Sequence, residues 1–289
     1  MIATEGGQPP DRYAVMGYPL HHSRSPFIHA RFAQQCAQRL VYEALEVRPE
    51  DFTTAVSSFF AAGGRGLNIT LPHKLAAYEW AHSLSERARR AGAVNTLAVQ
   101  GDGTVLGDNT DGAGLVRDLT VNLRHDLRGQ RVLILGAGGA ARGVIGPLLE
   151  CGPSELAVTN RTESRALNLV SDFIAADPGL ATVLRAYSVA ALAGAFDVII
   201  NATSASLAGE LPEIGPPQVH TTTLCYDMAY GSEPTVFVRW ARAHHLRAEM
   251  GLGMLVEQAA ESFFLWRGVR PQTRAVLAEL QQLTQSAGR

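Results

Sequence analysis

Residues 131–141, RVLILGAGGAA, decide the fold. We expect a strand at residues 131–135, because an unbroken apolar run, VLIL, follows Arg131, as in a strand buried on both faces of a parallel sheet. The next six fit the pattern G-x-G-x-x-A, in which glycines permit a tight turn and let the backbone approach a pyrophosphate. A helix through about Glu150 would then offer free N–H groups to phosphate at its start. We therefore favour dinucleotide binding over a bare turn, and assign it to Gly136, Ala137, Gly138, Gly139 and Ala140.

Strands and helices alternate on both sides of this turn, a pattern typical of a mostly parallel sheet. Before the turn, we expect strands at residues 12–17, 41–47, 66–71 and within 92–99, and helices at 25–38, 49–62 and after Pro72. We also expect residues 101–103, GDG, to form a turn between two strands. After it, we expect strands at residues 155–159, 181–185, 196–201 and 224–228, and helices at 162–175 and 234–244. Two helices, at 252–263 and 271–283, follow without a strand after them.

Composition excludes several classes of protein. The chain has 289 residues, enough for about two domains of ~150 residues. An apolar share of 46% and a charged share of 18% exclude a disordered polymer, and a net charge of −2 argues against a nucleic-acid partner. Three widely spaced cysteines give neither a disulfide framework nor a metal pattern, so we expect no metal and a cytoplasmic location. Residues 1–11 show no basic segment followed by an apolar run, so we expect no signal peptide there. No run of ~18 apolar residues occurs, and we expect no membrane partner.

The residues after the second strand of this block distinguish two dinucleotides. An NAD site usually carries Asp or Glu about 20 residues beyond the glycines, on the ribose 2′-hydroxyl. This chain instead has Asn160, Arg161 and Thr162, with Arg165 one helical turn later. No acid would repel a 2′-phosphate, and two guanidiniums can bind it bidentately, so we predict NADP as the cofactor. Alternatively, the two arginines only begin a solvated helix.

A small polar segment, NATS at residues 201–204, follows a third strand of the same block. Small polar side chains leave room there for a nicotinamide or a ribose, and we assign Asn201 and Thr203 to the cofactor site. A plain Asx or Ser turn explains the spacing nearly as well.

The first third of the chain carries four polar segments that apolar packing does not explain. They are SRSP at 23–26, NITLPHK at 68–74, AVNT at 93–96 and GDNTDG at 107–112. Strand alternation places Asn68 and Thr70 on one face of a strand. Lys74 lies near the start of a helix, where its charge opposes the helix dipole, so stability alone does not favour it.

These segments resemble those of the shikimate dehydrogenase family. The matching stretches run in the family's order from about Tyr13 to Gly268, and they are HSRSPFIHARFAQQ, GGRGLNITLPHK, AGAVNTL, GDNTDG, ILGAGGAARGV, NRTESRA, NATS, CYDMAY and GLGMLVEQAA. The family catalyses the reversible NADPH-dependent reduction of 3-dehydroshikimate to shikimate, in chorismate and aromatic amino-acid biosynthesis. The resemblance therefore implies an NADP-dependent oxidoreductase that acts on a CH–OH group of a small-molecule substrate, shikimate.

The resemblance also implies roles for single residues. Lys74 and Asp111 correspond to the family's catalytic pair, and hydride delivery to a ketone does require a proton donor for the oxygen. Met228 and Gly251 correspond to cofactor positions. The substrate-binding positions are Ser23, Ser25, Asn68, Thr70, Asn95, Tyr230 and Gln258.

The residues themselves leave simpler interpretations open. Asp111 also fits a helix N-cap, and Lys74 an ordinary surface lysine. Ser25 also fits the N-cap of a helix that has Pro26 at its first position. Tyr230 also fits an ordinary packed tyrosine.

Three positions depart from the family's common pattern. His73 stands where a large apolar residue often precedes the lysine, and we expect it at the edge of the pocket. Met250 stands where the family often has Asp, so the resemblance does not fix the shape of the turn there. Ser206 replaces a frequent Gly after NATS, which leaves the shape of that loop open.

The resemblance and the order of elements together predict an α/β protein of two α/β domains. Residues 1–110 and 251–289 would form a discontinuous substrate-binding catalytic domain with a mostly parallel sheet. Residues 111–250 would form a Rossmann-type NADP-binding domain, with Asp111 at the crossover and the cleft between the domains. We expect a monomer or a homodimer.

Two other functions stay open. A quinate/shikimate dehydrogenase that uses NAD is the nearest alternative, although Asn160-Arg161-Thr162 and the two serines of SRSP argue against it. A non-catalytic shikimate-pathway sensor on the same fold belongs to another class. Such a sensor is free to lose Lys74 or Asp111, and this chain keeps both.

Overall fold

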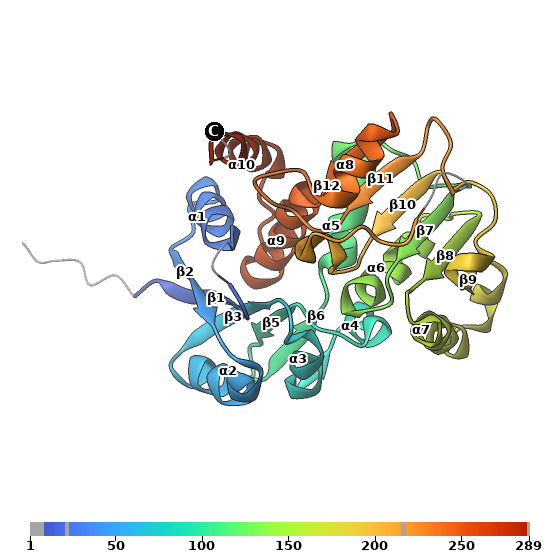
Figure 1. Cartoon of the computed structure of the whole chain (residues 1–289). Helices are drawn as coiled ribbons and strands as arrows, with labels where there is room; N and C mark the ends of the chain where they lie inside the picture. Colours follow the sequence, from blue (N-terminus) through green and yellow to red (C-terminus); the bar gives the residue numbers. More distant parts are fainter. Residues whose placement is uncertain (1–8, 21–22, 215–217, 288–289) are drawn as a thin grey trace, which may run out of the picture.

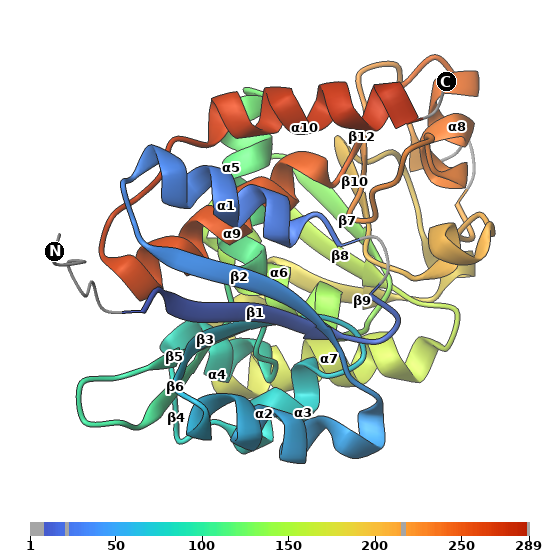
Figure 2. The same cartoon turned by 90° about the vertical axis from the view of Figure 1, so that its left-hand side faces the viewer.

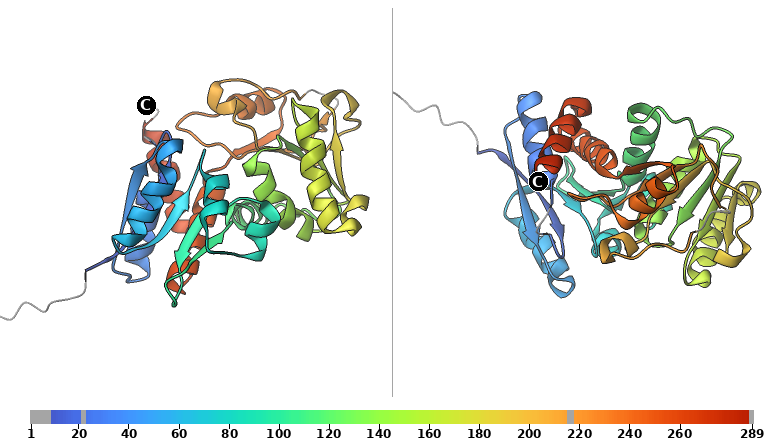
Figure 3. Two further views of the ribbon diagram at one scale, coloured as in Figure 1. Left: turned by 90° about the horizontal axis from the view of Figure 1, so that it is seen from below. Right: turned by 45° about the horizontal axis from the view of Figure 1, so that its top comes forward.

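The chain folds into two halves, each built around a six-stranded sheet (Figures 1 and 3). The computed structural model describes residues 9–20, 23–214 and 218–287. Strands of the first sheet come from the N-terminal third of the chain, and strands of the second from residues 131–250. Most strand pairs are parallel, so the predicted α/β class with two mostly parallel sheets is confirmed.

The first sheet has the order β2-β1-β3-β5-β6-β4. Its parallel pairs are β1 with β2, β1 with β3 and β4 with β6, whereas β5 runs antiparallel to both of its neighbours. The strands are β1 (Asp11–Gly17), β2 (Leu40–Glu46), β3 (Gly64–Ile69), β4 (Ser83–Leu84), β5 (Thr96–Val99) and β6 (Val105–Asp108).

Helices cover both faces of the first sheet (Figure 2). One side carries α1 (Ser25–Gln35), α9 (Leu252–Arg267) and α10 (Thr273–Ala287), and the other carries α2 (Phe52–Ala61), α3 (Lys74–Trp80) and α4 (Glu86–Ala91). Ile28, Phe263 and Leu280 are fully buried together, one from each helix of the first group. The last two helices therefore return to pack against the first sheet.

The second sheet has the order β12-β11-β10-β7-β8-β9, and all of its pairs are parallel. The order reverses between β7 and β10, where open α/β sheets bind ligands. Its strands are β7 (Arg131–Leu135), β8 (Glu155–Thr159), β9 (Leu184–Tyr187), β10 (Val198–Asn201), β11 (Leu224–Asp227) and β12 (Arg247–Met250).

Helices also pack on both faces of the second sheet. The core on one face includes α5 (Asp111–Arg117), α6 (Gly139–Glu150) and α7 (Glu163–Ala176), and the core on the other includes α8 (Val236–Ala243). The described residues also form short helical turns, among them η1 (Pro49–Asp51), the π-helical η2 (Asp118–Asn122), η3 (Pro178–Thr182), η4 (Val189–Ala191) and η5 (Ala205–Ala208). None of the described helices combines the length and apolarity that a membrane span requires.

The predicted strand at residues 181–185 is wrong in its position. Residues 178–182 form η3, and the strand is β9. The carboxylate of Asp177 accepts a hydrogen bond from the N–H of Gly179 at 3.0 Å, and Pro178 follows the cap. An acidic cap before proline favours a helical turn, which moves the strand toward the C-terminus.

Other local differences are smaller. Ser25 is not an N-cap, because α1 begins at Ser25 itself and Arg24 occupies the cap position. Helix α1 also ends at Gln35, earlier than residue 38. The predictions omit β4, α4, α5 and β12. β12 has only four residues, and its burial does not alternate, so it gives no clear strand signal.

Helix α5 joins the two halves. It packs against both α6 and α9. A Cβ on Gly112 would lie 2.4 Å from Cγ of Pro147 in α6, so only glycine allows this close approach. Just beyond α5, buried Asp118 accepts a hydrogen bond from the Tyr226 hydroxyl of β11 at 2.6 Å. The helix is therefore fixed to α6 near its first residue and, just beyond its last, to β11 of the second sheet.

We predict that Phe263→Ala lowers the free energy of unfolding by about 3–5 kcal/mol, because it leaves a cavity among α1, α9 and α10. The neighbouring Phe264 is 42% exposed and gives a matched control, for which we expect a loss below about 1 kcal/mol. Urea denaturation followed by far-UV circular dichroism measures both values. Equal losses for the two variants would contradict this packing.

Candidate active site

A partly buried ion pair lies at the junction of the two halves. Nζ of Lys74 donates a hydrogen bond to Oδ2 of Asp111, and their side chains are 14% and 8% exposed. Lys74 is the first residue of α3, where the helix dipole disfavours a cation, and Asp111 is the first residue of α5, where the dipole favours an anion. Lys74 is also the only lysine in a chain with 25 basic Lys and Arg residues.

Buried Asn95 holds the second oxygen of this carboxylate. Its Nδ2 donates to Oδ1 of Asp111 and to Oγ1 of Thr110, both at 2.9 Å, and its Oδ1 accepts from the Thr110 N–H at 2.8 Å. Oε1 of Gln258 in α9 accepts from Asn95 Nδ2 at 3.3 Å. Each oxygen of Asp111 therefore has its own donor, and the carboxylate cannot rotate without losing one of them.

The hydrogen bonds continue across the first sheet to Asn68. Nδ2 of Asn68 donates to Oγ of Ser262 at 2.9 Å, and its Oδ1 accepts from the Tyr42 hydroxyl at 2.7 Å. Ser25 lies near the hydroxyl of the same tyrosine and lowers its pKa, but burial outweighs this effect and raises that pKa. Amides and hydroxyls are neutral groups that both donate and accept hydrogen bonds. They therefore suit a ligand that carries several hydroxyl groups.

The other predicted substrate residues are less tightly connected. Oγ of Ser23 accepts from the N–H of Ser25 at 3.4 Å. Thr70 follows β3 two residues after Asn68. Tyr230 packs against the core shared by α1 and α9, and burial raises its pKa. Within the described chain, the side chains of Thr70 and Tyr230 form no hydrogen bond to this network.

Sequence reasoning missed Tyr42 and Ser262. Ser262 lies one helical turn after Gln258, so the two form a polar pair on one face of a largely buried helix, which is a visible signal. Tyr42 lies in an alternating strand that gives no such hint.

From the sequence we expected His73 at the edge of the pocket, and this prediction is wrong. It is 2% exposed, its Nε2 is 2.7 Å from the carbonyl oxygen of Val47, and its ring stacks on Phe52 at 4.8 Å. His73 therefore packs α3 against the core beneath the sheet.

A second buried ion pair supports the segment that leads to Asp111. Nε of Arg87 donates to Oδ1 of Asp108 at 2.7 Å, and its Nη1 donates to Glu261 of α9 at 2.9 Å. Burial by itself would raise the pKa of Asp108, but the bonds and charge of Arg87 outweigh it and lower that pKa. The pair thus ties α4, β6 and α9 together behind the site.

The predicted phosphate turn has the required shape. Gly136 follows β7 with φ +109°, and a Cβ there would lie 3.0 Å from Cγ2 of Thr203. No atom lies within 4 Å of a Cβ built on Gly138 or Gly139, which leaves open space over the start of α6. Ala141 is fully buried, as its role in packing this helix requires. The turn therefore fits a pyrophosphate.

The predicted 2′-phosphate residues follow β8, next to this turn. Nδ2 of Asn160 donates to the carbonyl oxygen of Thr162 at 2.9 Å and shapes the loop. Arg161 and Arg165 are exposed, and neither has an ion-pair partner among the described residues. Two guanidiniums that have no ion-pair partner in the described chain and lie beside the predicted phosphate turn fit an additional anionic group.

The NATS segment does form the Asx turn that we considered. Oδ1 of fully buried Asn201 accepts from the N–H of Thr203 at 3.1 Å and from its hydroxyl at 2.7 Å. The carbonyl oxygen of Asn201 accepts from the N–H of Met228 at 3.0 Å. A Cβ on Gly251 would lie 2.3 Å from the carbonyl oxygen of Met228, so the three predicted cofactor segments pack on one another.

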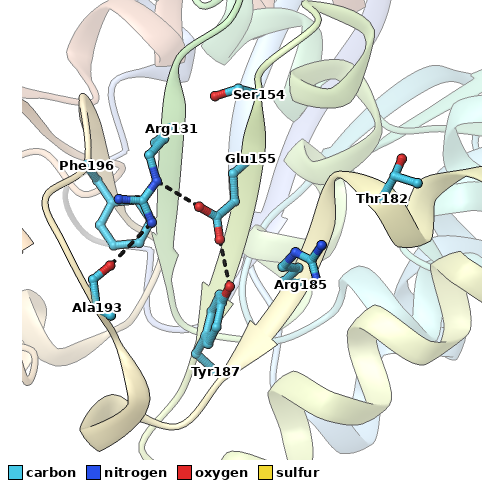
Figure 4. Close-up of a pocket in the computed structure, with 8 residues that line it drawn as sticks. All are labelled: Arg131, Ser154, Glu155, Thr182, Arg185, Tyr187, Ala193 and Phe196. Atoms are coloured by element: carbon cyan, nitrogen blue, oxygen red, sulfur yellow. Dashed lines mark hydrogen bonds and ion pairs between the residues drawn. The ribbon is translucent and has the colours of Figure 1, made fainter.

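Two cavities lie away from these residues. One of about 360 Å³ opens near the amino ends of β7 and β8, where Glu155 accepts hydrogen bonds from Arg131 and Tyr187 (Figure 4). The other, of about 770 Å³, lies among α4, α5, α6 and α9. The five arginines that line it are each paired with an acid, namely Arg87, Arg90, Arg117, Arg142 and Arg270. The described residues hold no cluster of three or more potential metal ligands.

The buried imidazole of His29 leads us to predict that the free energy of unfolding depends on pH. It is fully buried in α1, stacks on Tyr42 at 4.1 Å, and its ring nitrogens have no hydrogen-bond partner among the described residues. Burial lowers its pKa from 6.5 to about 3. Between these two values the unfolded chain binds a proton that the folded protein does not, so stability falls as the pH falls.

We predict that His29→Phe, which keeps the ring stack, flattens this dependence. Between pH 6.5 and 4.5, the free energy of unfolding of the wild type should fall more steeply than that of the variant, by up to about 1.4 kcal/mol per pH unit. Urea denaturation at several pH values measures both slopes. Identical slopes would show that His29 does not remain neutral in the folded protein.

Family models match most of the chain. The match to the shikimate dehydrogenase substrate binding domain covers residues 15–97, that to shikimate/quinate 5-dehydrogenase covers 118–209, and that to the shikimate 5′-dehydrogenase C-terminal domain covers 251–281. A shikimate dehydrogenase (NADP(+)) from Alkalilimnicola ehrlichii is 54% identical over 272 residues, which are 94% of this chain and 98% of that protein.

Solved structures are similar as well. An Ael1 enzyme from Pseudomonas putida has a TM-score of 0.83 and 46% identity, over 93% of this chain and 98% of the other. Shikimate 5-dehydrogenase from Thermus thermophilus, in complex with NADP(H) and shikimate, has a TM-score of 0.81 and 34% identity, over 95% and 99% of the two chains. With a 54% identical relative matched over almost its whole length, this chain belongs to the shikimate dehydrogenase family.

Proposed function

We propose that this chain catalyses the reversible NADPH-dependent reduction of 3-dehydroshikimate to shikimate, in chorismate and aromatic amino-acid biosynthesis. The observation that carries the proposal is the Lys74–Asp111 pair, which lies within a network of neutral amides and hydroxyls. The curated relatives named shikimate dehydrogenase (NADP(+)) support it, and so does the Thermus thermophilus structure with NADP(H) and shikimate.

The two halves would bind different molecules, one the substrate and the other the dinucleotide. We assign residues 1–110 and 251–289 to the substrate-binding catalytic domain, because α9 and α10 share a core with α1. We assign residues 111–250 to the NADP-binding domain, and Leu115 of α5 supports this boundary because it packs in the core of the second sheet. Asp111 then stands where the chain crosses from one domain to the other.

The substrate would lie against the first sheet. Ser23 and Ser25 would bind its carboxylate, and the N–H groups at the start of α1 favour an anion at that place. The ring hydroxyls would meet amides and hydroxyls that the network already orients. We assign these contacts to Asn68, Thr70, Asn95, Gln258 and Tyr230.

Lys74 would supply and recover the proton of the reaction. When bound, NADPH supplies the hydride to the carbonyl carbon. Nζ of Lys74 then donates a proton to the carbonyl oxygen as negative charge develops there, and in the opposite direction its neutral amine takes the hydroxyl proton. Asp111 keeps Nζ in place, and Asn95 keeps Asp111 in place. Arginine cannot exchange its proton in this way, which gives a reason for the single lysine.

The second sheet would hold the dinucleotide along the ends of its strands. Arg161 and Arg165 would bind the 2′-phosphate, and the start of α6 would bind the pyrophosphate. The remaining cofactor positions are Gly136, Ala137, Gly138, Gly139, Ala140, Asn160, Thr162, Asn201, Thr203, Met228 and Gly251.

We further propose a cytoplasmic location and a monomeric or homodimeric state. Three free cysteines support a reducing compartment. Cys225 is buried, which raises the pKa of its thiol to about 12 and makes it unreactive.

Spectrophotometric assays of shikimate and quinate, each with NADP and with NAD, test the proposed function. We expect strong activity only for shikimate with NADP. Comparable activity for quinate with NAD would instead support the quinate/shikimate dehydrogenase, a name that one matching family model also carries.

We predict that Lys74→Ala lowers kcat by about 100- to 10,000-fold, because the reaction loses its general acid, while the variant still folds. Its melting temperature should fall, because Asp111 keeps a largely buried charge without its partner. Lys74→Arg keeps the positive charge and the partner of Asp111, yet it cannot release its proton, so it should lose activity as well. Steady-state kinetics and thermal melting measure both variants. A near-normal kcat in either variant would refute the role of Lys74 as proton donor.

We predict that Arg161→Ala raises the KM for NADP about tenfold to a hundredfold, because a charge-assisted hydrogen bond to the 2′-phosphate is lost. The KM for NAD, which lacks that phosphate, should stay near its wild-type value. Arg185 is an exposed arginine of β9, the edge strand of the same sheet. Arg185→Ala is therefore the control, and it should change neither KM. Equal increases for both dinucleotides in Arg161→Ala would exclude the 2′-phosphate contact.

A further inference from the structure

We propose that Ser206 is a positioning residue for the dinucleotide: its hydroxyl locks together the two loops against which the nicotinamide end would lie. Ser206 belongs to η5, which begins just after the NATS segment. The inference rests on the proposed function for the identity of the dinucleotide. It concerns only residues of this chain.

The Ser206 hydroxyl bridges the ends of two neighbouring strands. Its Oγ donates to Oδ2 of Asp227, at the end of β11, with a distance of 2.6 Å. The same Oγ accepts from Nδ2 of Asn201, at the end of β10, with a distance of 3.0 Å. Asn201 and Asp227 are both fully buried, so no solvent replaces a lost bond without rearrangement.

On the first side of the bridge, Ser206 fixes the orientation of an amide. Nδ2 of Asn201 needs an acceptor, and Ser206 provides it. Oδ1 is then directed to the N–H and the hydroxyl of Thr203. Through this turn Thr203 comes against Gly136, because its Cγ2 would be 3.0 Å from a Cβ at that glycine. The bridge therefore sets the gap between the phosphate turn and the NATS segment.

On the second side, Ser206 shares a carboxylate with the start of α8. Oδ2 of Asp227 also accepts from the hydroxyl of Thr235, at 2.7 Å, and its Oδ1 accepts from the N–H of Ala229, at 3.0 Å. Met228 lies between these contacts, and its carbonyl oxygen leaves no room for a side chain at Gly251. The bridge therefore also fixes the segment that leads toward α9.

Loss of the hydroxyl would let these two loops move independently. The arginines after β8 and the Lys74–Asp111 pair lie on other elements and keep their own contacts. We therefore expect weaker binding of the part that NADP and NAD share, with no change in the discrimination between them. This signature differs from that of Arg161→Ala, which affects NADP alone.

The test is a direct titration of purified Ser206→Ala with NADP and with NAD, by isothermal calorimetry in the absence of substrate. We expect both dissociation constants to rise by the same factor, about two- to tenfold, as the loss of one buried hydrogen-bond bridge implies. Ser206→Thr keeps the hydroxyl and should restore wild-type affinity. Ser58→Ala, an exposed serine of α2, should bind both dinucleotides as the wild type does.

The KM for shikimate and the melting temperature distinguish positioning from general damage. In Ser206→Ala, positioning predicts an unchanged KM for shikimate and a melting temperature within a few degrees of the wild type. Unchanged dissociation constants, a loss confined to NADP, or a failure of Ser206→Thr to restore affinity would each overturn the proposal. If the wild type binds NADP but does not oxidise shikimate, the proposed function fails, while the titrations still decide the role of Ser206.

Discussion

An ion pair between the first residues of two short helices, Lys74 and Asp111, is the interaction on which the rest of the structure depends. The dipole of α3 disfavours the lysine, and partial burial disfavours both charges. The pair is therefore sustained only while each charge faces the other and the remaining oxygen of Asp111 keeps its hydrogen bond to Asn95. Geometry of this kind requires a rigid surrounding, and the fold supplies it from several directions.

Three features fix Asp111 relative to the first sheet and to the second. Behind it, Arg87 joins Asp108 to Glu261 and so links β6 with α9. Beside it, Gly112 lets α5 approach α6 closely. At the far end of α5, Asp118 accepts from Tyr226, and burial raises the pKa of Asp118. The proton-donating group and the helix of the phosphate turn are thus parts of one connected structure, although they belong to different halves.

Much of this arrangement follows from the sequence. Arg131 and the apolar run at residues 132–135 predict β7 with its observed bounds, and the glycines after it predict the turn. The sequence predicts that Asn68, Asn95, Gln258, Lys74 and Asp111 lie together, and hydrogen bonds join them. Ser25, which belongs to the same prediction, lies near the Tyr42 hydroxyl that donates to Asn68.

The rest could not be predicted because it depends on contacts between distant segments. Tyr42 matters through its distance to Asn68, which no local pattern encodes. The sequence suggests that His73 is a pocket residue, but its ring stacks on Phe52 and is buried in the core. The Ser206 hydroxyl acquires its role only where β10 and β11 end side by side. Short elements such as β4 also lack a periodic pattern long enough to recognise.

A double-mutant cycle on Lys74→Ala and Asp111→Ala tests most directly whether the two residues act as one unit. The measured quantity is kcat/KM for shikimate at saturating NADP in the wild type, both single variants and the double variant. Residues that act as a unit give strongly non-additive losses. We therefore predict that the double variant is about as slow as the slower single variant. A double variant whose loss equals the product of the two single losses would contradict the account.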